Sequence, residues 1–585
     1  MDQTNRNTAL ASAFVEELAR CGLRRAVIAP GSRSTPLALA LWRETAVEAA
    51  VIVDERSAGY LALGAAHASG HPVAVLCTSG TAAANLHPAV CEADESGVPL
   101  LVLTADRPPE LRGIGAGQTI DQLKLYGAAV RWFCEVGSHA ADDAGLLHMR
   151  ATACRAWAAA AGDPRPGPVH VNLSWRDPLG PEPHPEDVTA TSELALAGRG
   201  ERPLTAVPRP GAPAPADELV EVLAGHVRDQ RRGLILCGRQ PDARLAEPLT
   251  ALAAAAGYPI LAEPTSQLRL GPHDRSLVVS TYDAIARAQP PPLEPELVLR
   301  FGETPTSKAL RAWLGSLAGS REIAIDGSYG WNNPMRHASV MLRVDPVALA
   351  AALASALETP SANRWIENWR AADEAARAAF TAGLEPAGDP SEPAIHAALG
   401  ALYRDGDLVY TASSMPIRDQ EAFLPPAPAA VRFLANRGAN GIDGLVSSGI
   451  GAGAASGAPT WIVTGDLGLH HDANGLAALC HSPAPVRIVV LHNDGGGIFE
   501  LLPQAQQLGR DEFESLFATP VGLDVGKLAA LYALPHRRID RLADLAAGAN
   551  DETVLIEVRV DRRADAKLRR RLAAGAVEAV REAVR

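Results

Sequence analysis

The chain has 585 residues, more than one hydrophobic core normally accommodates, so we expect three or four domains. Its formal net charge of -13 and the lack of a long basic run in its body argue against nucleic-acid binding. The nearest candidate for a membrane span, from Leu249 to Ala262, is too short and contains a glycine and a proline, so we expect no membrane insertion.

The cysteines and the N-terminus indicate a reducing compartment. The seven cysteines are odd in number and form no CxxC pair, and several lie in apolar runs such as Val75-Leu76-Cys77. We therefore interpret them as reduced residues and not as a disulfide or zinc framework. The first ten residues lack the basic and then apolar pattern of a signal peptide, so we expect a cytoplasmic protein.

The first segment, residues 1–180, alternates short apolar runs with helical patterns. We predict strands at 26–29, 50–53, 73–77, 100–104 and 169–173, with helices such as 58–69 and 82–95 between them. Continuous apolar strands that alternate with helices are typical of a parallel sheet with both faces covered. This segment is therefore predicted to be one α/β domain.

The remaining segments repeat this alternation. A Pro- and Gly-rich linker is expected at 181–216, a middle α/β domain at 217–357, a connecting segment at 358–392, and a third α/β domain at 393–585. Strands are predicted at 233–237, 259–262, 297–301, 408–412, 431–435, 461–464, 487–492 and 554–558. The basic stretch at 562–571 is interpreted as the solvated face of a C-terminal helix. The predicted fold class is α/β, with three doubly wound parallel-sheet domains.

Two polar positions follow neighbouring apolar runs in the third domain. Asp466 ends one run, and Asn493 ends the next, 27 residues later, ahead of three glycines that begin at Gly495. A carboxylate, an amide oxygen and a backbone carbonyl at the carboxyl edge of a parallel sheet suit Mg²⁺, which usually completes its shell with phosphate oxygens and water. The pattern therefore predicts a metal that bridges the protein to a diphosphate. Taken alone, Asp466 would more often be a helix cap and the glycines a turn.

Motifs in the first segment supply a family resemblance. The strings are Asp54-Glu55-Arg56-Ser57-Ala58-Gly59, Cys77-Thr78-Ser79-Gly80-Thr81 and Leu103-Thr104-Ala105-Asp106-Arg107-Pro108. They resemble the pyrimidine-binding domain of thiamine diphosphate enzymes, and the segment from Gly465 to Asn493 resembles their diphosphate-binding domain. The order of pyrimidine, middle and diphosphate domains is similar to the decarboxylase-like branch across nearly the whole chain. The resemblance implies thiamine diphosphate as cofactor, with Mg²⁺ or, alternatively, Mn²⁺.

The resemblance assigns Glu55 to catalysis. A carboxylate beside N1′ of the aminopyrimidine favours the imino tautomer that removes the thiamine C2 proton. Read alone, a glutamate at a strand-to-helix junction is more often placed there by the helix dipole. By the same resemblance, the cofactor-binding residues are Glu55, Thr78, Ser79, Gly80, Asp466, Asn493, Gly495, Gly496, Ile498, Phe499 and Leu502, and the metal ligands are Asp466, Asn493 and Gly495.

Longer strings narrow the resemblance. Ala29-Pro30-Gly31-Ser32-Arg33-Ser34-Thr35-Pro36-Leu37, Asn436-Arg437-Gly438-Ala439-Asn440-Gly441-Ile442-Asp443-Gly444 and His492-Asn493-Asp494-Gly495-Gly496-Gly497-Ile498-Phe499 are similar to the MenD family, the 2-succinyl-5-enolpyruvyl-6-hydroxy-3-cyclohexene-1-carboxylate synthases. The wider superfamily often has glycine at the position of Leu467, and the MenD branch tolerates other residues there. The resemblance implies a transferase that decarboxylates 2-oxoglutarate, adds the succinyl unit to isochorismate and releases CO₂, in menaquinone or phylloquinone biosynthesis.

The resemblance also implies that the substrate site is cationic and that two subunits share each active site. The residues carried over are Ser32, Arg33, Arg107, Gln118, Lys308, Ser414, Arg418 and Arg437. Both substrates are dicarboxylates, and arginine binds carboxylates in bidentate geometry, although any one of these cations alone would more often be an ordinary surface residue. In this family Glu55 of one subunit completes the site on another, which implies a homodimer or a homotetramer.

Three alternatives stay open at this point. A related enzyme such as an acetolactate synthase or a 2-oxoacid decarboxylase would act without isochorismate. A non-catalytic cofactor-binding protein would show no turnover. A dinucleotide oxidoreductase has weak support, because the glycine-rich stretches at 113–117 and 449–453 lack G-x-G-x-x-G spacing. Arg239 and Arg269 of the middle domain could serve an effector site, but ordinary surface arginines are the simpler interpretation.

Overall fold

The computed structural model describes residues 1–162, 165–208, 211–328, 330–357, 363–384 and 388–585. These residues form three six-stranded sheets in which every pair of neighbouring strands is parallel. The predicted fold class is therefore confirmed. Contacts divide the chain into two compact units.

Unit 1 comprises residues 1–210, 436–457 and 471–484 and contains the first sheet. The strands are β1 (Arg25–Ile28), β2 (Glu48–Val51), β3 (Val73–Cys77), β4 (Leu100–Asp106), β5 (Trp132–Glu135) and β6 (Pro168–Ser174), in the order β2-β1-β3-β4-β6-β5. The helices are α1 (Arg6–Cys21), α2 (Thr35–Arg43), α3 (Glu55–Ser69), α4 (Thr81–Asn85), α5 (His87–Ser96), α6 (Asp143–Ala161) and α7 (Glu193–Ala197).

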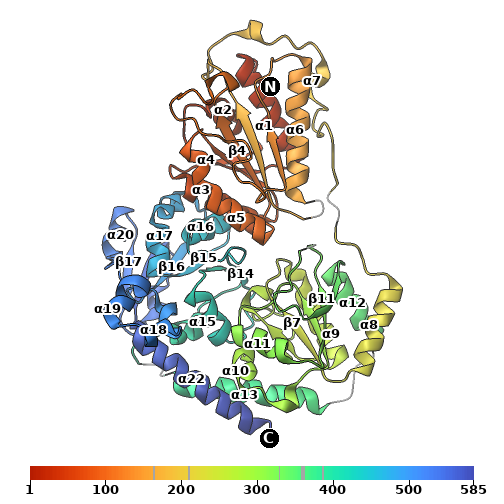
Figure 1. Cartoon of the computed structure of the whole chain (residues 1–585), viewed down its shortest axis with the longest axis vertical. Coiled ribbons are helices and arrows are strands. Elements are labelled where there is room, and N and C mark those ends of the chain that lie inside the picture. The colour runs from red at the N-terminus through yellow and green to blue at the C-terminus, as the bar shows by residue number, and fades with distance from the viewer. Residues whose placement is uncertain (163–164, 209–210, 329, 358–362, 385–387) are drawn as a thin grey trace. The chain divides into compact units, whose positions relative to one another are not determined.

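Period-two alternation assigns the residues of each strand in the first sheet to two faces. The face that carries Ile28, Leu76 and Leu103 packs against α1, α2 and α6 in one apolar cluster, and Figure 1 shows α1 and α6 side by side on the sheet. Helix α3 packs on β1 and β3. Unit 1 also holds α16 (Leu445–Ser456) and the 3₁₀ helix η6 (Ala473–His481), and α16 lies against α3.

Unit 2 contains the middle sheet. Its strands are β7 (Gly233–Cys237), β8 (Ile260–Ala262), β9 (Val278–Val279), β10 (Leu297–Phe301), β11 (Arg321–Ile325) and β12 (Ala338–Leu342), in the order β12-β11-β10-β7-β8-β9. The helices are α8 (Asp217–Asp229), α9 (Ala246–Ala256), α10 (Tyr282–Ala288), α11 (Lys308–Ser316) and α12 (Pro346–Ala356). The predicted connecting segment includes α13 (Arg364–Gly383), while residues 358–362 and 385–387 of that segment lie outside the described residues.

Unit 2 also contains the third sheet. The strands are β13 (Leu408–Thr411), β14 (Arg432–Leu434), β15 (Thr460–Gly465), β16 (Val486–His492), β17 (His536–Ile539) and β18 (Val554–Arg559), in the order β14-β13-β15-β16-β18-β17. The helices that follow or precede them are α14 (Glu392–Leu399), α15 (Met415–Phe423), α17 (Asp466–His471), α18 (Gln504–Gln507), α19 (Arg510–Phe513), α20 (Val525–Leu531), α21 (Leu545–Gly548) and α22 (Arg562–Ala583). Numbered by position within its domain, this strand order is the same as that of the first sheet.

The strands that the sequence missed are mostly edge strands. β5, β9, β12 and β17 each lie at the end of a sheet, and β5, β12 and most of β17 are only partly buried. A half-exposed edge strand carries a weaker apolar signal than a central strand such as β4, which is buried throughout. The predicted helix at 82–95 is two helices, because Pro88 lies in the first turn of α5.

The interpretation of the basic stretch at 562–571 as a solvated face is wrong in part. Arg569 is nearly buried and contacts the carboxylates of Glu392 and Asp419. Arg562 donates to the backbone carbonyls of Asn493 (3.1 Å) and Asp494 (2.7 Å). Helix α22 packs against α13 near the bottom of Figure 1. In the described part of the chain, no helix combines the length and the hydropathy that a bilayer span requires.

Candidate functional site

The predicted site residues of unit 1 follow the carboxyl ends of consecutive strands. Ser32 and Arg33 come after β1, Glu55 after β2, Thr78 to Gly80 after β3, and Arg107 directly after β4. Because all of these strands are parallel, their carboxyl ends lie at one edge of the sheet. Ligands of doubly wound sheets bind at this edge, so the fold brings together residues that are far apart in sequence.

Glu55 is the first residue of α3. The cap of this helix comes from its neighbour, since Asp54 Oδ1 accepts the backbone N–H of Arg56 at 2.9 Å. The start of the helix therefore does not depend on the Glu55 carboxylate for its cap. Burial, and after it the nearby charge of Glu55, raises the pKa of the Cys77 thiol, which ends β3. The Glu55 carboxylate thus lies near the end of the central strand.

The loop after β3 is held by two glutamines. Gly80 has a φ of 84°, and its backbone N–H donates to Gln122 Oε1 at 2.9 Å. Ser79 Oγ donates to the carbonyl of Gln118 at 3.0 Å, and Gln118 Nε2 returns a bond to the carbonyl of Ser79 at 3.2 Å. The Thr78 hydroxyl is buried and has no hydrogen-bond partner among the described residues. The loop therefore combines a fixed backbone with an unsatisfied hydroxyl.

Two arginines of the predicted substrate site are neighbours in unit 1. Arg107 Nη1 donates to Ser79 Oγ, and its Nη2 donates to the carbonyl of Gly117 at 3.0 Å. Arg33 is 9% exposed, and its Nη1 donates to the carbonyl of Trp175 at 2.9 Å. Burial and the charge of Arg107 lower the pKa of the Arg33 guanidinium, while Asp177 acts in the opposite sense. Two adjacent cations, one with an unpartnered buried Nε, form an anion-binding arrangement.

Arg437 also belongs to unit 1 and is half-buried. The backbone N–H groups that follow it, at Gly438 (2.8 Å) and Ala439 (2.7 Å), donate to the carboxylate of Glu92 on α5. Glu92 is buried, so these bonds compensate its charge and hold the segment that carries Arg437. No sequence pattern predicted this role for Glu92.

The predicted metal ligands lie together in unit 2. Asp466 is the first residue of α17, directly after β15, and its Oδ2 accepts the backbone N–H of Gly495 at 2.9 Å. Burial raises the pKa of Asp466 to about 6. Gly495 has a φ of 142°, and an added Cβ would lie 2.4 Å from the carbonyl oxygen of Ala518. Only glycine fits there without strain.

Asn493 follows β16 and has one unsatisfied oxygen. Its Nδ2 donates to Glu392 Oε1 at 2.6 Å, which orients the side-chain amide. Its Oδ1 is buried without a hydrogen-bond partner among the described residues. A buried, unpaired amide oxygen is costly unless a cation or a donor completes it. Together with the Asp466 carboxylate, this oxygen fits a hard divalent cation such as Mg²⁺.

The remaining predicted residues of unit 2 lie on or beside three elements. Ile498 and Phe499 are on the 3₁₀ helix η7 (Gly497–Leu501), and Leu502 follows it with 36% exposure. Lys308 begins α11 and is exposed; the backbone N–H of the preceding Ser307 donates to Glu421 on α15 at 2.9 Å. Ser414 precedes α15 with a φ of 75°, and its carbonyl accepts from Arg418 Nη1. Lys308 and Arg418 thus belong to neighbouring helices.

Comparison with known proteins identifies the family. Residues 8–125 match the family described as thiamine pyrophosphate enzyme, N-terminal TPP binding domain. The chain is 42% identical over 578 residues to the 2-succinyl-5-enolpyruvyl-6-hydroxy-3-cyclohexene-1-carboxylate synthase of Myxococcus xanthus, with 97% of each chain covered. The chain belongs to this synthase family. The synthase of Chloroflexus aurantiacus is 43% identical over 536 residues, covering 89% of this chain and 87% of the relative. That of Geobacillus thermodenitrificans is 41% identical over 578 residues, covering 97% and 96%.

Membership of the synthase family confirms the family prediction and makes the chain a thiamine diphosphate-dependent enzyme of the transferase class. The individual site residues are not tested by these similarities and stay predictions. The structure adds residues that the sequence interpretation left out of the site. His492 and Asp494 lie with Asp466 so that their ligand atoms fall within 4.8 Å of one another. His492 Nδ1 is already bonded to Glu557 at 2.7 Å. Their position beside Asn493 was the only signal in the sequence.

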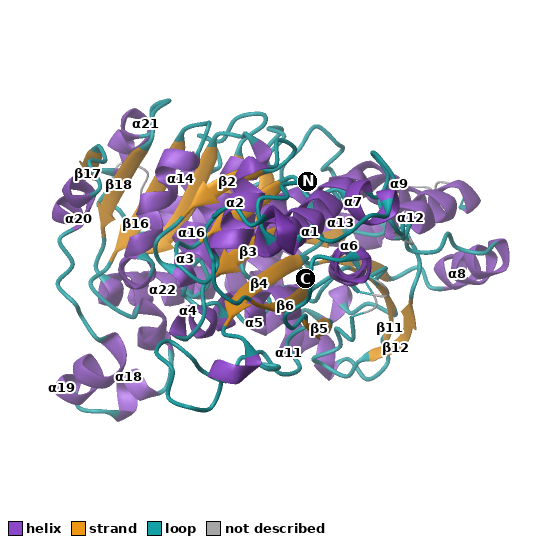
Figure 2. Ribbon diagram, turned by 90° about the horizontal axis from the view of Figure 1, so that it is seen from above, coloured by secondary structure: helices purple, strands orange, loops and turns teal. Residues whose placement is uncertain are grey.

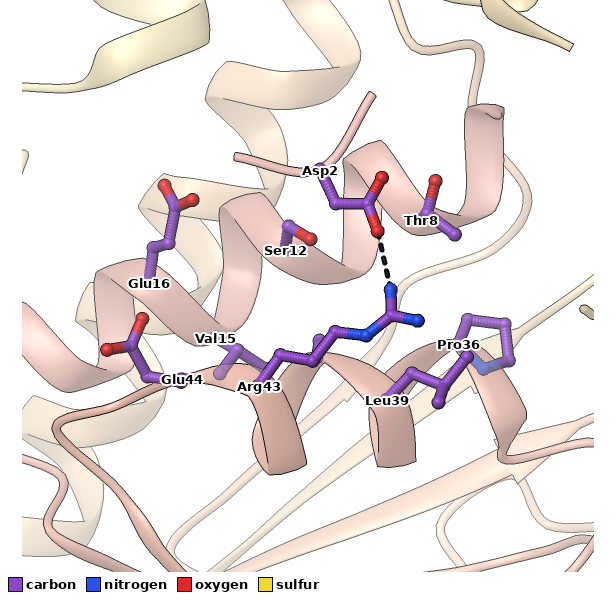
Figure 3. Close-up of a pocket in the computed structure, with 10 residues that line it drawn as sticks. Asp2, Thr8, Ser12, Val15, Glu16, Pro36, Leu39, Arg43 and Glu44 are labelled. Carbon is purple, nitrogen blue, oxygen red and sulfur yellow. Dashed lines mark hydrogen bonds and ion pairs between the residues drawn. The ribbon is translucent and has the colours of Figure 1, made fainter. Parts of the chain in front are cut away.

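A cavity of about 160 Å³ lies near the N-terminus and is drawn in Figure 3. The ion pair of Arg43 and Asp2, at 2.7 Å, crosses it, and no predicted site residue lines it.

The interpretation of Arg269 as a surface arginine is wrong, because it is fully buried and donates to the carbonyls of Ala262 (2.7 Å) and Glu421 (2.6 Å). Arg239 forms an ion pair with Glu303. Their bonds are internal to unit 2.

Proposed function

We propose that this enzyme decarboxylates 2-oxoglutarate, adds the remaining four-carbon succinyl unit to isochorismate and releases CO₂, in menaquinone or phylloquinone biosynthesis. The observation that carries the proposal is the similarity to synthases of one name over nearly the full length of the chain. The adjacent cations Arg33 and Arg107 support it, because both substrates are dicarboxylates and the protein as a whole is acidic. An enzyme for a small monoanionic oxoacid would have less need for such a pair.

Thiamine diphosphate, when bound, supplies a nucleophilic carbon and an electron sink for the decarboxylation. The task of Glu55 is to share a proton with N1′ of the aminopyrimidine ring and so to favour the imino tautomer. Its place beside the end of β3, near Thr78 to Gly80, agrees with a ring-binding site at this edge. Glu55→Gln should lower the exchange rate of the thiamine C2 proton by about 100-fold or more. Full exchange in this variant would remove Glu55 from the mechanism.

Asp466, Asn493 and the carbonyl of Gly495 would hold the metal that binds the diphosphate. The support is the unsatisfied Asn493 Oδ1, the buried Asp466 carboxylate and the close backbone at Gly495. Mg²⁺ suits this set of oxygen ligands, and Mn²⁺ is the alternative. The metal site neutralises the diphosphate, while Ile498, Phe499 and Leu502 of the next segment provide apolar contacts for the rest of the cofactor.

The cations that the family motifs carry over would bind the substrate carboxylates. Arg33, Arg107 and Arg437 would serve from unit 1, with Ser32 and Gln118 as hydrogen-bonding partners. Lys308, Ser414 and Arg418 would serve from unit 2. The guanidinium groups can form paired hydrogen bonds with carboxylates, which fixes the orientation of the substrate as well as neutralising its charge.

We further propose that the active enzyme is a homodimer or a homotetramer in which Glu55 of one subunit serves the diphosphate domain of another. The domain boundaries proposed are 1–180 for pyrimidine binding, 217–357 for the middle domain and 393–585 for diphosphate binding. Mixing the Glu55→Gln and Asp466→Ala variants tests the shared site. Heterodimers would contain one site free of both changes, so about a quarter of wild-type activity should return. No recovery after subunit exchange would place both residues of a site in one subunit.

The reaction itself is tested with purified protein, thiamine diphosphate and Mg²⁺. CO₂ release from 2-oxoglutarate and consumption of isochorismate should be equal in amount, and each should depend on the other substrate. Turnover of pyruvate or of another 2-oxoacid without isochorismate would favour a general decarboxylase or an acetolactate synthase. Cofactor binding without any turnover would favour a non-catalytic protein.

A further inference from the structure

A buried carboxylate lies where α3 and α16 begin. Asp472 is 0% exposed, and its two oxygens accept three hydrogen bonds: from the Ser447 backbone N–H (2.6 Å), the Ser447 hydroxyl (2.9 Å) and the Ser57 hydroxyl (3.4 Å). Ser447 is in the first turn of α16, and Ser57 is in the first turn of α3. One side chain therefore joins the starts of two helices, and all of these residues belong to unit 1.

The need for this carboxylate follows from the sequence at the start of α16. The N-cap position is Gly444, which has a φ of 65° and no side chain to accept from the free backbone N–H groups. Asp472 supplies the missing acceptor from 25 residues further along the chain. Its negative charge is also favoured by the positive ends of both helix dipoles. Burial nevertheless raises the pKa of Asp472 to about 6, so the position is costly.

The segment that carries Asp472 holds the first turn of α3 at two more points. Asn474 Nδ2 donates to Asp54 Oδ2 at 2.8 Å, and Arg56 Nη2 donates to the carbonyl of His471 at 2.5 Å. With the Ser57 contact, three of the four residues from 54 to 57 are bonded to the segment 471–474. The fourth of these residues is Glu55. The segment thus fixes the residues on both sides of Glu55.

The bodies of the two helices leave little freedom for adjustment. An added Cβ at Gly64 of α3 would lie 1.9 Å from the carbonyl oxygen of Ser448, and one at Gly451 of α16 would lie 2.0 Å from that of Leu61. The backbones are therefore in direct contact, and Figure 1 and Figure 2 show α3 and α16 adjacent. Two helices packed this closely cannot slide past one another. The orientation of the first turn of α3 therefore depends on its local hydrogen bonds.

We propose that Asp472 is a positioning residue for Glu55, which sets the direction of its carboxylate through Ser57 and the first turn of α3. The proposal rests on the proposed role of Glu55 and adds a residue that the predicted site did not include. Asp472 does not touch the reacting atoms; it acts through the helix start. A misplacement of about 1 Å at a reacting group can cost about 100-fold in rate, so small changes in this turn should be measurable.

The first test measures the apo protein. Asp472→Asn keeps the shape of the side chain but places an amide N–H₂ against at least one of the donors at Ser447 and Ser57. Hydrogen exchange followed by mass spectrometry should show faster exchange in peptides that cover residues 54–60. Asp142→Ala is the matched control: Asp142 caps α6 in the same unit and accepts from Gly145 N–H at 2.8 Å. Unchanged exchange at 54–60 in Asp472→Asn would overturn the proposal.

The second test measures the loaded enzyme. Asp472→Asn should lower both kcat and the exchange rate of the thiamine C2 proton by about 10- to 100-fold. The milder Ser57→Ala should lower both by about 3- to 10-fold. In both variants KM for 2-oxoglutarate should stay within about 2-fold of the wild-type value. Asp142→Ala should lower the melting temperature without this loss of kcat. If Asp472→Asn lowers only the melting temperature, its role is structural and the proposal is wrong. Ser57→Ala keeps the test available if the Asp472 variant fails to fold.

A double-variant cycle separates action through Glu55 from an independent effect. If Asp472 acts only through Glu55, the Glu55→Gln/Asp472→Asn enzyme should exchange the C2 proton no more slowly than Glu55→Gln alone. A multiplicative loss would overturn the proposal. If the wild-type enzyme failed to consume 2-oxoglutarate and isochorismate together, the proposed function would fail, while C2 exchange and apo-protein exchange would still report on the positioning of Glu55.

Discussion

Arg569 on α22 allows a quantitative test of how the third domain compensates buried charge. Its Nε lies 2.9 Å from Asp419 Oδ1, and its Nη2 contacts both Glu392 and Asp419, each of which is 2% exposed. Asp565, 3% exposed, accepts the backbone N–H of Glu392 at 3.0 Å. Replacing Arg569 with methionine removes the cation and keeps an unbranched side chain, so the carboxylates lose their partner without a large cavity.

The expected loss is large because the carboxylates cannot recover their hydration. Removing one partner of a buried ion pair costs about 3–5 kcal/mol. At the roughly 2–4 °C per kcal/mol typical of domains of 150–250 residues, the melting temperature should fall by about 10 °C. Because Glu392 also accepts from Asn493 Nδ2, Arg569→Met should weaken Mg²⁺ binding as well.

The loss should increase with pH. Burial raises the pKa of Asp565 to about 7 and raises that of Glu392. A carboxyl group whose pKa is higher in the folded state favours folding when protonated, so stability falls as the pH rises from the unfolded pKa of about 4 through the folded pKa. Without Arg569 both pKa values should rise further. The variant should therefore lose more stability at pH 8 than at pH 6.

Thermal unfolding at pH 6 and pH 8 measures both effects. Arg563→Met is the matched control, because Arg563 lies on the same helix and pairs with Glu514 but its side chain is 53% exposed. Exposed pairs contribute about 0–1 kcal/mol, so this variant should melt within about 3 °C of wild type. The reasoning would be refuted if the two variants lost the same stability at pH 8. It would also be refuted if Arg569→Met lost more stability at pH 6 than at pH 8.

Three further predictions concern the site. Asp466→Ala should weaken Mg²⁺-dependent binding of thiamine diphosphate by about 100-fold or more in calorimetric titration; wild-type affinity would rule out its role as a metal ligand. Gly495→Ala should destabilise the protein by about 1–3 kcal/mol in thermal unfolding, because its φ is 142° and the new Cβ would lie 2.4 Å from the Ala518 oxygen; an unchanged melting temperature would contradict this. Arg33→Met should raise KM for at least one dicarboxylate about 10- to 100-fold, and unchanged KM for both would exclude it from the substrate site.

Local sequence was sufficient to predict the central strands and the residues at their ends. β3, β7 and β10 begin and end where their apolar runs do. Asp466 and Asn493 could be placed at one edge because both directly follow strands of a parallel sheet. The family prediction was reached in the same way, from strings that lie at these strand ends, and it is confirmed.

Contacts between distant residues could not be predicted in this way. Arg569 and Glu392 are 177 positions apart, and nothing near either residue indicates that the other compensates its charge. The same holds for Asp472 and Ser57, which are 415 positions apart. The basic face of α22 was misread for this reason: helical periodicity shows which residues share a face, but not whether a buried acidic group lies opposite them.

The shared strand order of the first and third sheets has a practical consequence for engineering. Each sheet presents loops after its first four strands in chain order, and the proposed ring, phosphate and substrate contacts other than Lys308 are distributed among those loops. Central strands beneath them, such as β3, are apolar and buried and could vary in sequence while keeping their shape. A library confined to the loops after β1, β4 and β13 would therefore vary most of the residues proposed to bind substrate, but not Arg437 or Lys308. It would leave Glu55 and Asp466 untouched, so substrate preference could be evolved without rebuilding the cofactor site.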